Sequence, residues 1–187
     1  MDSVEQKQGV VLLSGGIDST ACAHFLKSAG FAVSALFIDY GHPANPREHE
    51  AAASVARELG IHLATCRITA NTHFSSGEVR GRNAFLIYAA LMYSSLQHGV
   101  IAMGVHAGTP YYDCSETFVS RISKEISELT DGHVQVFAPF VTWDKSDITD
   151  YAKEQNISLL HTYSCEEGGN APCGTCLSCK DREELLC

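Results

Sequence analysis

The stretch VVLLSGGIDSTACAHFL, residues 10–26, decides the predicted fold because an apolar run passes directly into Ser-Gly-Gly and then Asp-Ser. Residues 9–13 predict a buried strand, and apolar residues at three- and four-residue steps over 18–29 predict a helix with one apolar face. Glycines between a strand and a helix let the backbone approach a ligand, and the helix start adds unpaired N–H groups and partial positive charge. The hydroxyls of Ser14, Ser19 and Thr20 add donors. The turn is therefore predicted to hold phosphate, with a plain tight turn as the alternative; no lysine follows the glycines, so it is not a Walker-type loop.

The rest of the chain alternates short apolar runs with helix-period segments. Further strands are predicted over 32–38, 62–68, 100–105 and 134–139, and further helices over 47–60, 82–99, 115–129 and 144–155. The helix over 82–99 is apolar almost all round and is expected to be buried. This alternation predicts an α/β fold with a Rossmann-like, mostly parallel sheet and helices on both faces. We expect one domain over 1–160 and a small metal-binding region over 161–187 packed on it.

The composition favours a soluble enzyme of small molecules over a nucleic-acid or membrane protein. The chain has 187 residues, 45% of them hydrophobic, and a formal net charge of −9. No apolar run approaches the roughly 20 residues of a membrane span, and the polar, acidic N-terminus predicts no signal peptide. The acidic balance weighs against a large nucleic-acid surface. We expect a cytoplasmic protein.

The cysteines near the C-terminus predict a metal site. Two overlapping C-x-x-C steps join Cys173, Cys176 and Cys179, and seven residues separate Cys165 from the first of them. Four thiolates at this spacing are typical of structural zinc and leave no open coordination position. An iron–sulfur cluster and redox or unliganded thiols are the alternatives.

The segment SGGIDS, residues 14–19, resembles the SGGxDS signature of the PP-loop ATP pyrophosphatases, which split ATP into AMP and pyrophosphate. The resemblance implies a PP-loop, adenine nucleotide alpha hydrolase-like fold, in which the loop holds pyrophosphate and AMP passes to a substrate oxygen. It implies catalytic roles for Asp18 and Ser19, with Asp18 helping to hold Mg²⁺. It also implies a catalytic role for Asp39, which closes the second strand near the metal or nucleotide.

Further segments narrow the family: DYGH (39–42), GRN (81–83), GV followed by YYDCSETF (104–118), WDKSDI (143–148), SC (164–165) and CGTCLSCKDR (173–182). In this order, and over nearly the whole chain, they look like the 7-cyano-7-deazaguanine synthases of queuosine biosynthesis. That resemblance implies ATP-dependent activation of 7-carboxy-7-deazaguanine, amide formation with ammonia, dehydration to the nitrile, zinc on four cysteines and a homodimer. It makes Lys145 a catalytic residue that neutralises phosphate. The implied nucleotide contacts are Leu13, Ser14, Gly15, Gly16, Ile17, Asp18, Ser19, Thr20, Leu36, Phe37, Ile38, Arg82, Asn83 and Gly104, and the implied substrate contacts are His106, Tyr112 and Asp113.

Several of these residues also have plainer interpretations. Arg82 could be a surface charge, Asn83 the cap of its helix, and Lys145 a solvated first-turn lysine. Asp113 could pair with the guanine-like edge of the substrate or be an ordinary turn residue. His42 and His106 are candidate proton carriers or ordinary loop histidines.

The chain departs from the family pattern on the substrate side. The stretch before GRN is shorter than in the family pattern. The loop from Gly104 to Cys114 is about two residues shorter than usual and has Gly108 and Thr109 where the family has an acidic residue. The segment HPANPREHE (42–50) is longer than usual. An alternative function is therefore a defence-system relative that joins a deazaguanine carboxylate to an amine, possibly on a protein, and stops at the amide. Two further alternatives are a tRNA-thiolating PP-loop enzyme, for which neither a basic surface nor a catalytic cysteine pair near the loop is evident, and a module that binds ATP without turnover.

Overall fold

The computed structural model describes residues 6–69, 74 and 78–186, with the side chains of 184–186 excepted. Its sheet has five parallel strands in the order β3-β2-β1-β4-β5. They are β1 (Gln8–Leu12), β2 (Ala32–Asp39), β3 (His62–Arg67), β4 (Gly99–Ala102) and β5 (Val134–Phe137). The register between β1 and β2 runs from Gln8 opposite Ala32 to Leu12 opposite Leu36, so the two strands end at the same edge. The predicted α/β class is confirmed.

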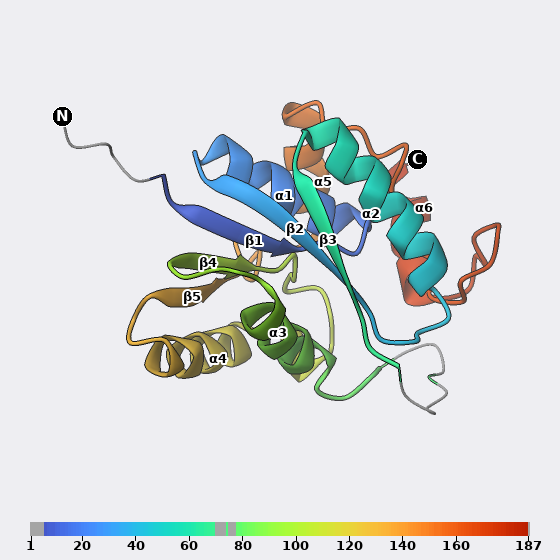
Figure 1. The fold of residues 1–187 in the computed structure, drawn as a ribbon. Coiled ribbons are helices and arrows are strands. Elements are labelled where there is room, and N and C mark those ends of the chain that lie inside the picture. The colour runs from blue at the N-terminus through green and yellow to red at the C-terminus, as the bar shows by residue number, and fades with distance from the viewer. Residues whose placement is uncertain (1–5, 70–73, 75–77, 187) are drawn as a thin grey trace.

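Helices cover both faces of the sheet (Figure 1). On one face lie α1 (Ile17–Ser28), α2 (Asn45–Leu59) and α5 (Lys145–Glu154); on the other lie α3 (Arg82–Tyr93) and α4 (Glu116–Leu129). A 3-10 turn, η1 (Tyr112–Cys114), precedes α4, and α6 (Leu177–Leu186) closes the chain. Because alternate side chains of each buried strand point to opposite faces, this arrangement gives two separate cores.

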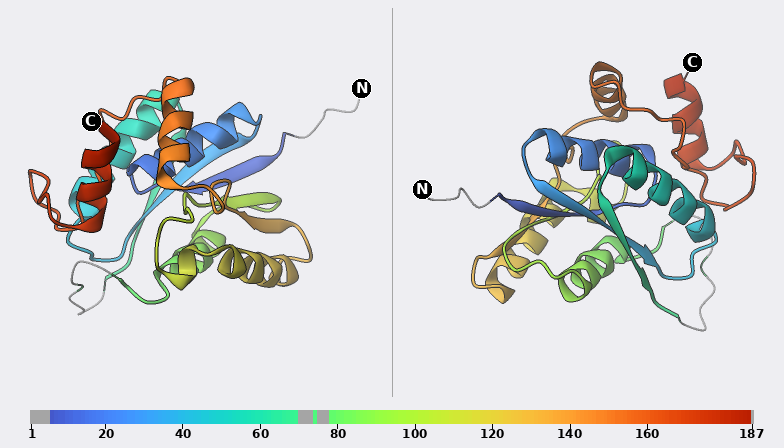
Figure 2. Two further views of the ribbon diagram at one scale, coloured as in Figure 1. Left: turned by 180° about the vertical axis from the view of Figure 1, so that it is seen from behind. Right: turned by 45° about the horizontal axis from the view of Figure 1, so that its top comes forward.

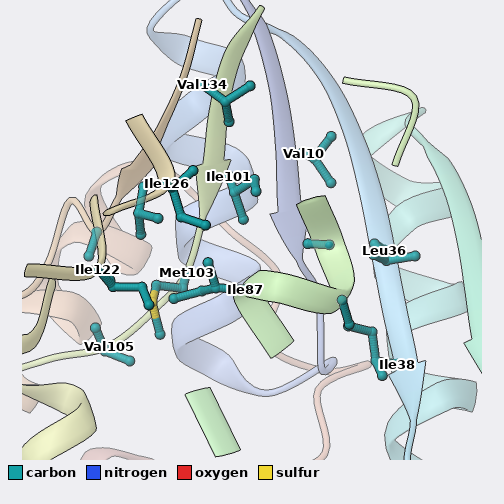
Figure 3. Packing of buried hydrophobic residues seen from close by; sticks show 14 of the residues in the cluster. Val10, Leu36, Ile38, Ile87, Ile101, Met103, Val105, Ile122, Ile126 and Val134 are labelled. Atoms are coloured by element: carbon teal, nitrogen blue, oxygen red, sulfur yellow. The ribbon is translucent and has the colours of Figure 1, made fainter. Parts of the chain in front are cut away.

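The two cores lie on either side of the sheet. The core under α3 and α4 includes Val10, Ile87, Ile101 and Ile126 (Figure 3). The core under α1, α2 and α5 contains the fully buried residues Val11, Leu13, Leu26, Val55, Phe140 and Ile148. Adjacent residues such as Val10 and Val11 thus enter different cores, which explains why β1 reads as a continuous apolar run.

Local chemistry fixes the helix ends near the site. Asp144 caps α5, and its side chain accepts a hydrogen bond from the Asp147 amide while the Asp147 side chain accepts one from the Asp144 amide. This confirms the predicted cap. Gly60 ends α2 with φ +63°, a left-handed conformation that a glycine adopts without strain. The capping box places Lys145 at the first helical position of α5.

The helix predicted over 82–99 is shorter and less buried than expected. It ends at Tyr93, and Ser94 is already in extended conformation. Only one face of α3 packs on the sheet, through residues such as Ile87 and Ala90, while Met92 is 72% exposed and Tyr93 is 55% exposed. The expectation of a buried helix, drawn from its apolar composition, is therefore wrong for the outer side of α3, which no described helix covers.

The C-terminal segment folds back along α2 and α5 (Figure 2). The Tyr163 amide donates to the Gly15 carbonyl at 2.9 Å, and Arg182 of α6 donates to the Thr162 and Leu159 carbonyls. No helix is predicted over α6, because its ten residues overlap the cysteine cluster at Cys179 and carry no apolar repeat of their own. The contacts bring α6 toward the turn after β1.

In the part of the chain that the structure describes, every helix is too short or too polar to cross a lipid bilayer.

Candidate functional site

A cleft of about 280 Å³ lies at the carboxyl end of the sheet. Strands β2 and β3 lie on one side of β1 within the sheet, and β4 and β5 lie on its other side. The strand order therefore reverses at β1. In open parallel sheets, ligands bind at this point of reversal, outside the carboxyl ends of the strands. The Ser-Gly-Gly turn at residues 14–16 follows β1 and forms one wall of the cleft.

The turn after β1 leaves backbone donors free for a ligand. Gly15 has φ +80°, and a Cβ there would lie 2.5 Å from the Ala52 amide nitrogen, so only glycine fits. Gly16 caps α1 without a side-chain hydrogen bond, and the Gly16 carbonyl accepts from the Thr20 amide and from the Thr20 and Ser19 hydroxyls. The first-turn amides of α1 have no acceptor within the helix. They are therefore available to an anion in the cleft.

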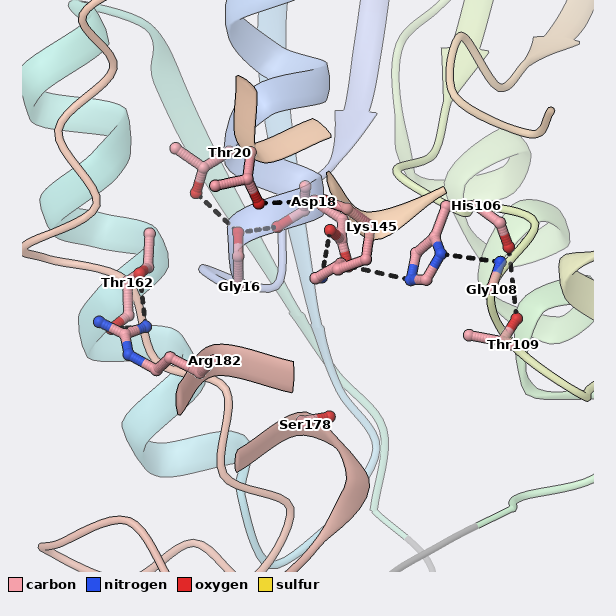
Figure 4. A network of polar contacts seen from close by, with 12 residues as sticks. Gly16, Asp18, Thr20, His106, Gly108, Thr109, Lys145, Thr162, Ser178 and Arg182 are labelled. Carbon is pink, nitrogen blue, oxygen red and sulfur yellow. Dashed lines mark hydrogen bonds and ion pairs between the residues drawn. The ribbon is translucent and has the colours of Figure 1, made fainter. Parts of the chain in front are cut away.

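Asp18 stands between two basic side chains at the floor of the cleft (Figure 4). The Lys145 ammonium donates to Asp18 Oδ1 at 2.5 Å, and His106 Nε2 lies 3.9 Å from Asp18 Oδ2. The three come from α1, α5 and the loop after β4, which lie apart in the sequence. The structure brings together a predicted metal ligand and a predicted phosphate-neutralising lysine.

Close packing against α1 requires a glycine at position 104. A Cβ at Gly104 would lie 2.4 Å from the Asp18 carbonyl oxygen. The loop after β4 can therefore approach the start of α1 only because residue 104 has no side chain. Gly104 also lines the cleft.

Most of the predicted nucleotide contacts line the cleft. These are Leu13, Ser14, Gly16, Ile17, Asp18, Ser19, Leu36, Phe37, Ile38, Arg82, Asn83 and Gly104, together with Lys145 and His106. Gly15 and Thr20 do not line the cleft. Gly15 packs against α2, and the Thr20 hydroxyl donates to the Gly16 carbonyl, so both stabilise the conformation of the turn. Arg82 faces the cleft as a half-buried cation, which disagrees with the alternative of a surface charge.

Asp39 does not line the cleft. Its Oδ1 accepts from the Gly41 amide and the Asn45 side chain, and its Oδ2 accepts from Arg67 Nε at 3.0 Å. Burial acts to raise the pKa of Asp39, but these hydrogen bonds outweigh it and lower the pKa. Both oxygens are thus occupied within the protein, and a direct contact of Asp39 with metal or nucleotide remains a prediction.

Asp113 and Tyr112 also lie outside the cleft lining. Asp113 Oδ2 accepts from the Asn83 amide at 3.1 Å, and its carbonyl accepts from Asn83 Nδ2. The Asn83 side chain does not cap α3, because Gly81 occupies the cap position. Tyr112 is 56% exposed, and its hydroxyl accepts from Arg121. The neighbouring Tyr111 lines the cleft instead.

Glu48 is the most informative cleft residue that sequence reasoning missed. It lies in the first turn of α2 with its side chain in the cleft, where Arg82 and Glu166 are its charged neighbours. Burial raises the pKa of Glu48 to about 7, Arg82 lowers it and Glu166 raises it further. Its only sequence signal is its place in the extended HPANPREHE segment, at the start of the helix predicted over 47–60. The packing of α2 on Gly15 brings Glu48 to the site.

The four predicted metal ligands meet in one cluster. The Sγ atoms of Cys165, Cys173, Cys176 and Cys179 all lie within 4.8 Å of one another, and the Cys173 and Cys179 sulfurs are 3.9 Å apart. Tetrahedral zinc with Zn–S bonds of about 2.3 Å places its sulfurs about 3.8 Å apart, so the donor set fits zinc. Hydrogen bonds from the Thr175 hydroxyl and from backbone amides lower the pKa of Cys173 to about 6. Burial raises the pKa of Cys179 to about 12, so thiolate, the form that binds metal, is favoured at Cys173 and not at Cys179.

Comparisons with known proteins agree with the fold and the motifs. The chain is 30% identical over 204 residues to a 7-cyano-7-deazaguanine synthase of Halobacterium salinarum (94% of this chain, 89% of the relative). It is 33% identical over 214 residues to one of Synechococcus sp. strain CC9902 (97% and 93%). Both alignments are longer than the 187-residue chain, so the relatives carry segments that this chain lacks.

Two solved structures share the fold. The structure of NMN synthetase from Francisella tularensis matches with a TM-score of 0.54 and 19% identity over 89% of this chain and 70% of that one. The glutamine-dependent NAD⁺ synthetase from Acinetobacter baumannii, in complex with ADP, matches with a TM-score of 0.50 and 19% identity over 81% and 30%.

The sequence model of the family described as "Queuosine biosynthesis protein QueC" matches residues 8–78 and 68–186. The two matched segments overlap at 68–78, in the shortened stretch that precedes GRN. Together they span the sheet, the cleft and the cysteine cluster, so the chain belongs to the QueC family of queuosine biosynthesis proteins.

Proposed function

We propose that the protein is an ATP-dependent ligase that converts 7-carboxy-7-deazaguanine and ammonia into 7-cyano-7-deazaguanine, releasing AMP and pyrophosphate. The names of its relatives, 7-cyano-7-deazaguanine synthases, support this product. The single observation that carries the ATP-dependent part is the turn after β1, whose free amides face a cleft at the reversal of strand order. Such a turn suits the concentrated charge of a departing pyrophosphate.

The first step is adenylation. A carboxylate oxygen of the substrate attacks the α-phosphorus of ATP, the bond from that phosphorus to the bridging oxygen breaks, and pyrophosphate leaves with the electron pair. In this proposal the amides of Ile17, Asp18 and Ser19 stabilise the pyrophosphate, and Lys145 offsets its charge. These donors are fixed before the reaction and need little reorganisation, which is the condition under which electrostatic stabilisation is largest.

The next steps form the nitrile. Ammonia attacks the acyl carbon, the bond to AMP breaks and one proton is lost, which gives the amide. A second ATP then activates the amide oxygen in the same manner, and loss of AMP together with the two N–H protons gives the nitrile. Both activations transfer AMP to an oxygen, so one cleft serves both.

The cations fit this scheme in separate places. Asp18 is the cleft carboxylate proposed to hold Mg²⁺, which would neutralise charge on the phosphates when bound. The four thiolates of the cysteine cluster are proposed to hold zinc, whose role is structural because no ligand position stays open. Neither assignment depends on the other.

Arg82, Glu48 and Tyr111, which all line the cleft, form the proposed substrate subsite. A guanidinium matches a carboxylate group, and a carboxylate matches the paired N–H donors of a guanine-like ring. Glu48 is thereby proposed for the contact with the guanine-like edge, which was one of the two interpretations of Asp113. Ammonia as nucleophile, a cytoplasmic location and a homodimer complete the proposal.

The test is a defined reaction with ATP, 7-carboxy-7-deazaguanine and ammonium, followed by mass spectrometry of the products. Nitrile, AMP and pyrophosphate support the proposal. Amide without nitrile favours the alternative of a conjugating relative, whose acceptor is a larger amine. The Asp18→Ala variant should release no pyrophosphate while its circular dichroism spectrum matches the wild type. Wild-type enzyme that never forms AMP from ATP would overturn the proposal.

A further inference from the structure

His106 is buried beside Asp18 and held by its own loop. Its side chain is 6% exposed, and the Gly108 amide donates to His106 Nδ1 at 3.1 Å. The loop is anchored to the segment before α5, because the Ala107 amide donates to the Trp143 carbonyl at 2.8 Å. The imidazole therefore has a fixed position relative to Lys145 (Figure 4).

The Gly108 contact determines which ring nitrogen carries the proton. A backbone amide can only donate, so Nδ1 must be the acceptor and the proton of the neutral ring is on Nε2. Nε2 is the atom that faces Asp18 Oδ2, at 3.9 Å. The ring thus presents an N–H donor to the carboxylate.

We propose that His106 is a positioning residue that donates an Nε2–H hydrogen bond to Asp18 and holds this carboxylate in place for adenylation. The inference deepens the proposed function, because Asp18 matters only if the cleft binds ATP. The 3.9 Å separation is longer than a hydrogen bond, and catalytic hydrogen bonds of this kind commonly tighten when substrate binds. His106 acts through Asp18 and carries no proton to the substrate.

The geometry of the loop holds the His106 ring in this position. A Cβ at residue 108 would lie 3.0 Å from His106 Nδ1 and Cε1, so the glycine allows the amide to reach the ring. Residue 108 is also one of the positions where the chain departs from the family pattern. The charged groups around the ring are Asp18 of α1, Lys145 and the adjacent Asp144, and Asp181 of α6.

A pair of substitutions separates the two ring nitrogens. In His106→Gln the side-chain amide can reach the Nε2 position and donate to Asp18. In His106→Asn the amide reaches only the Nδ1 position, which keeps the Gly108 contact and loses the donor. We expect His106→Gln to keep kcat for AMP formation within about threefold of wild type, and His106→Asn to lower it about tenfold or more with a smaller change in KM for ATP. Equal losses in the two variants would overturn the proposal.

NMR tests the proposal without any turnover. Two-bond ¹H–¹⁵N spectra of the wild-type protein should show His106 protonated on Nε2 and unprotonated on Nδ1. At fixed pH, the Asp18 carboxyl carbon signal should move in His106→Asn and stay in His106→Gln. A ring protonated on Nδ1, or an unmoved Asp18 signal, refutes the positioning role even if the enzyme is active. Wild-type protein that makes no AMP refutes the proposed function and leaves these spectra to decide the role of His106.

Discussion

Replacing Glu48 by glutamine tests the electrostatics of the cleft through protein stability. Glu48 is a half-buried carboxyl group whose pKa burial raises from 4.5 to about 7, against the opposing effect of Arg82. Between those two pH values the folded protein holds a proton that the unfolded chain has released. Stability therefore falls as the pH rises through this window, and the loss is complete above about pH 7.

The size of the effect follows from the two pKa values. Each pKa unit corresponds to about 1.4 kcal/mol, so the difference between 4.5 and about 7 amounts to roughly 3 kcal/mol at most. The Glu48→Gln side chain has similar size and no charge to desolvate, so this variant avoids the loss. It should match the wild type near pH 4.5 and be more stable by about 2–3 kcal/mol at pH 8.

Urea unfolding of both proteins at pH 5 and pH 8 measures this difference. Comparing the variant with the wild type at each pH removes the contributions of all other titrating groups. Glu58→Gln is the control, because Glu58 lies on α2 with an exposed side chain, and this variant should behave as the wild type at both pH values. If Glu48→Gln gains no stability at pH 8, Glu48 is not desolvated and the electrostatic account of the cleft is wrong. The same variant should lose activity, because the proposed partner of the guanine-like edge is then missing.

Three further changes test the turn and the metal site. Lys145→Met should lower pyrophosphate release about a hundredfold, whereas Lys153→Met, in the last turn of the same helix, should leave it unchanged. Cys176→Ser should abolish bound zinc in metal analysis and lower the melting temperature, and a stable, metal-free, active variant would contradict the structural role. Gly15→Ala should cost about 2–4 kcal/mol in chemical denaturation, because strain at φ +80° adds to overlap with α2. Gly30→Ala, at φ +84° in open space, should cost only about 1 kcal/mol.

The fold and the floor of the cleft could be predicted because their signals are local. The apolar run before Ser14 and the helix period after Gly16 are both properties of one short segment, and the capping box at Asp144 is contained in four residues. The cysteine spacing likewise needs no tertiary information. Residues within a few positions of one another in sequence stay close in space whatever the rest of the chain does.

The rest of the site depends on how separate elements meet. Glu48 enters the cleft because α2 packs on Gly15, and no pattern within α2 distinguishes Glu48 from the exposed Glu50 beside it. Tyr111 and Tyr112 are adjacent, and only the 3-10 turn at η1 decides which of them faces the cleft. The residue type of Asp113 suits either a substrate contact or a turn, and only the fold shows that its carboxylate accepts from the amide of Asn83.

The cysteine cluster and the cleft are linked through α6. Cys179 lies in the first turn of α6, so a metal bound by Cys179 and Cys165 would fix the start of that helix against the preceding segment. The Ser178 hydroxyl then donates to Glu166 at 2.9 Å, and Arg182 donates to the Thr162 hydroxyl at 2.8 Å. Ser178, Asp181 and Arg182 all line the cleft. Ser178 and Arg182 lie across from the loop that carries His106 (Figure 4). A metal bound by these four cysteines would therefore influence the shape of the cleft without a catalytic role, because it would fix the position of one cleft wall.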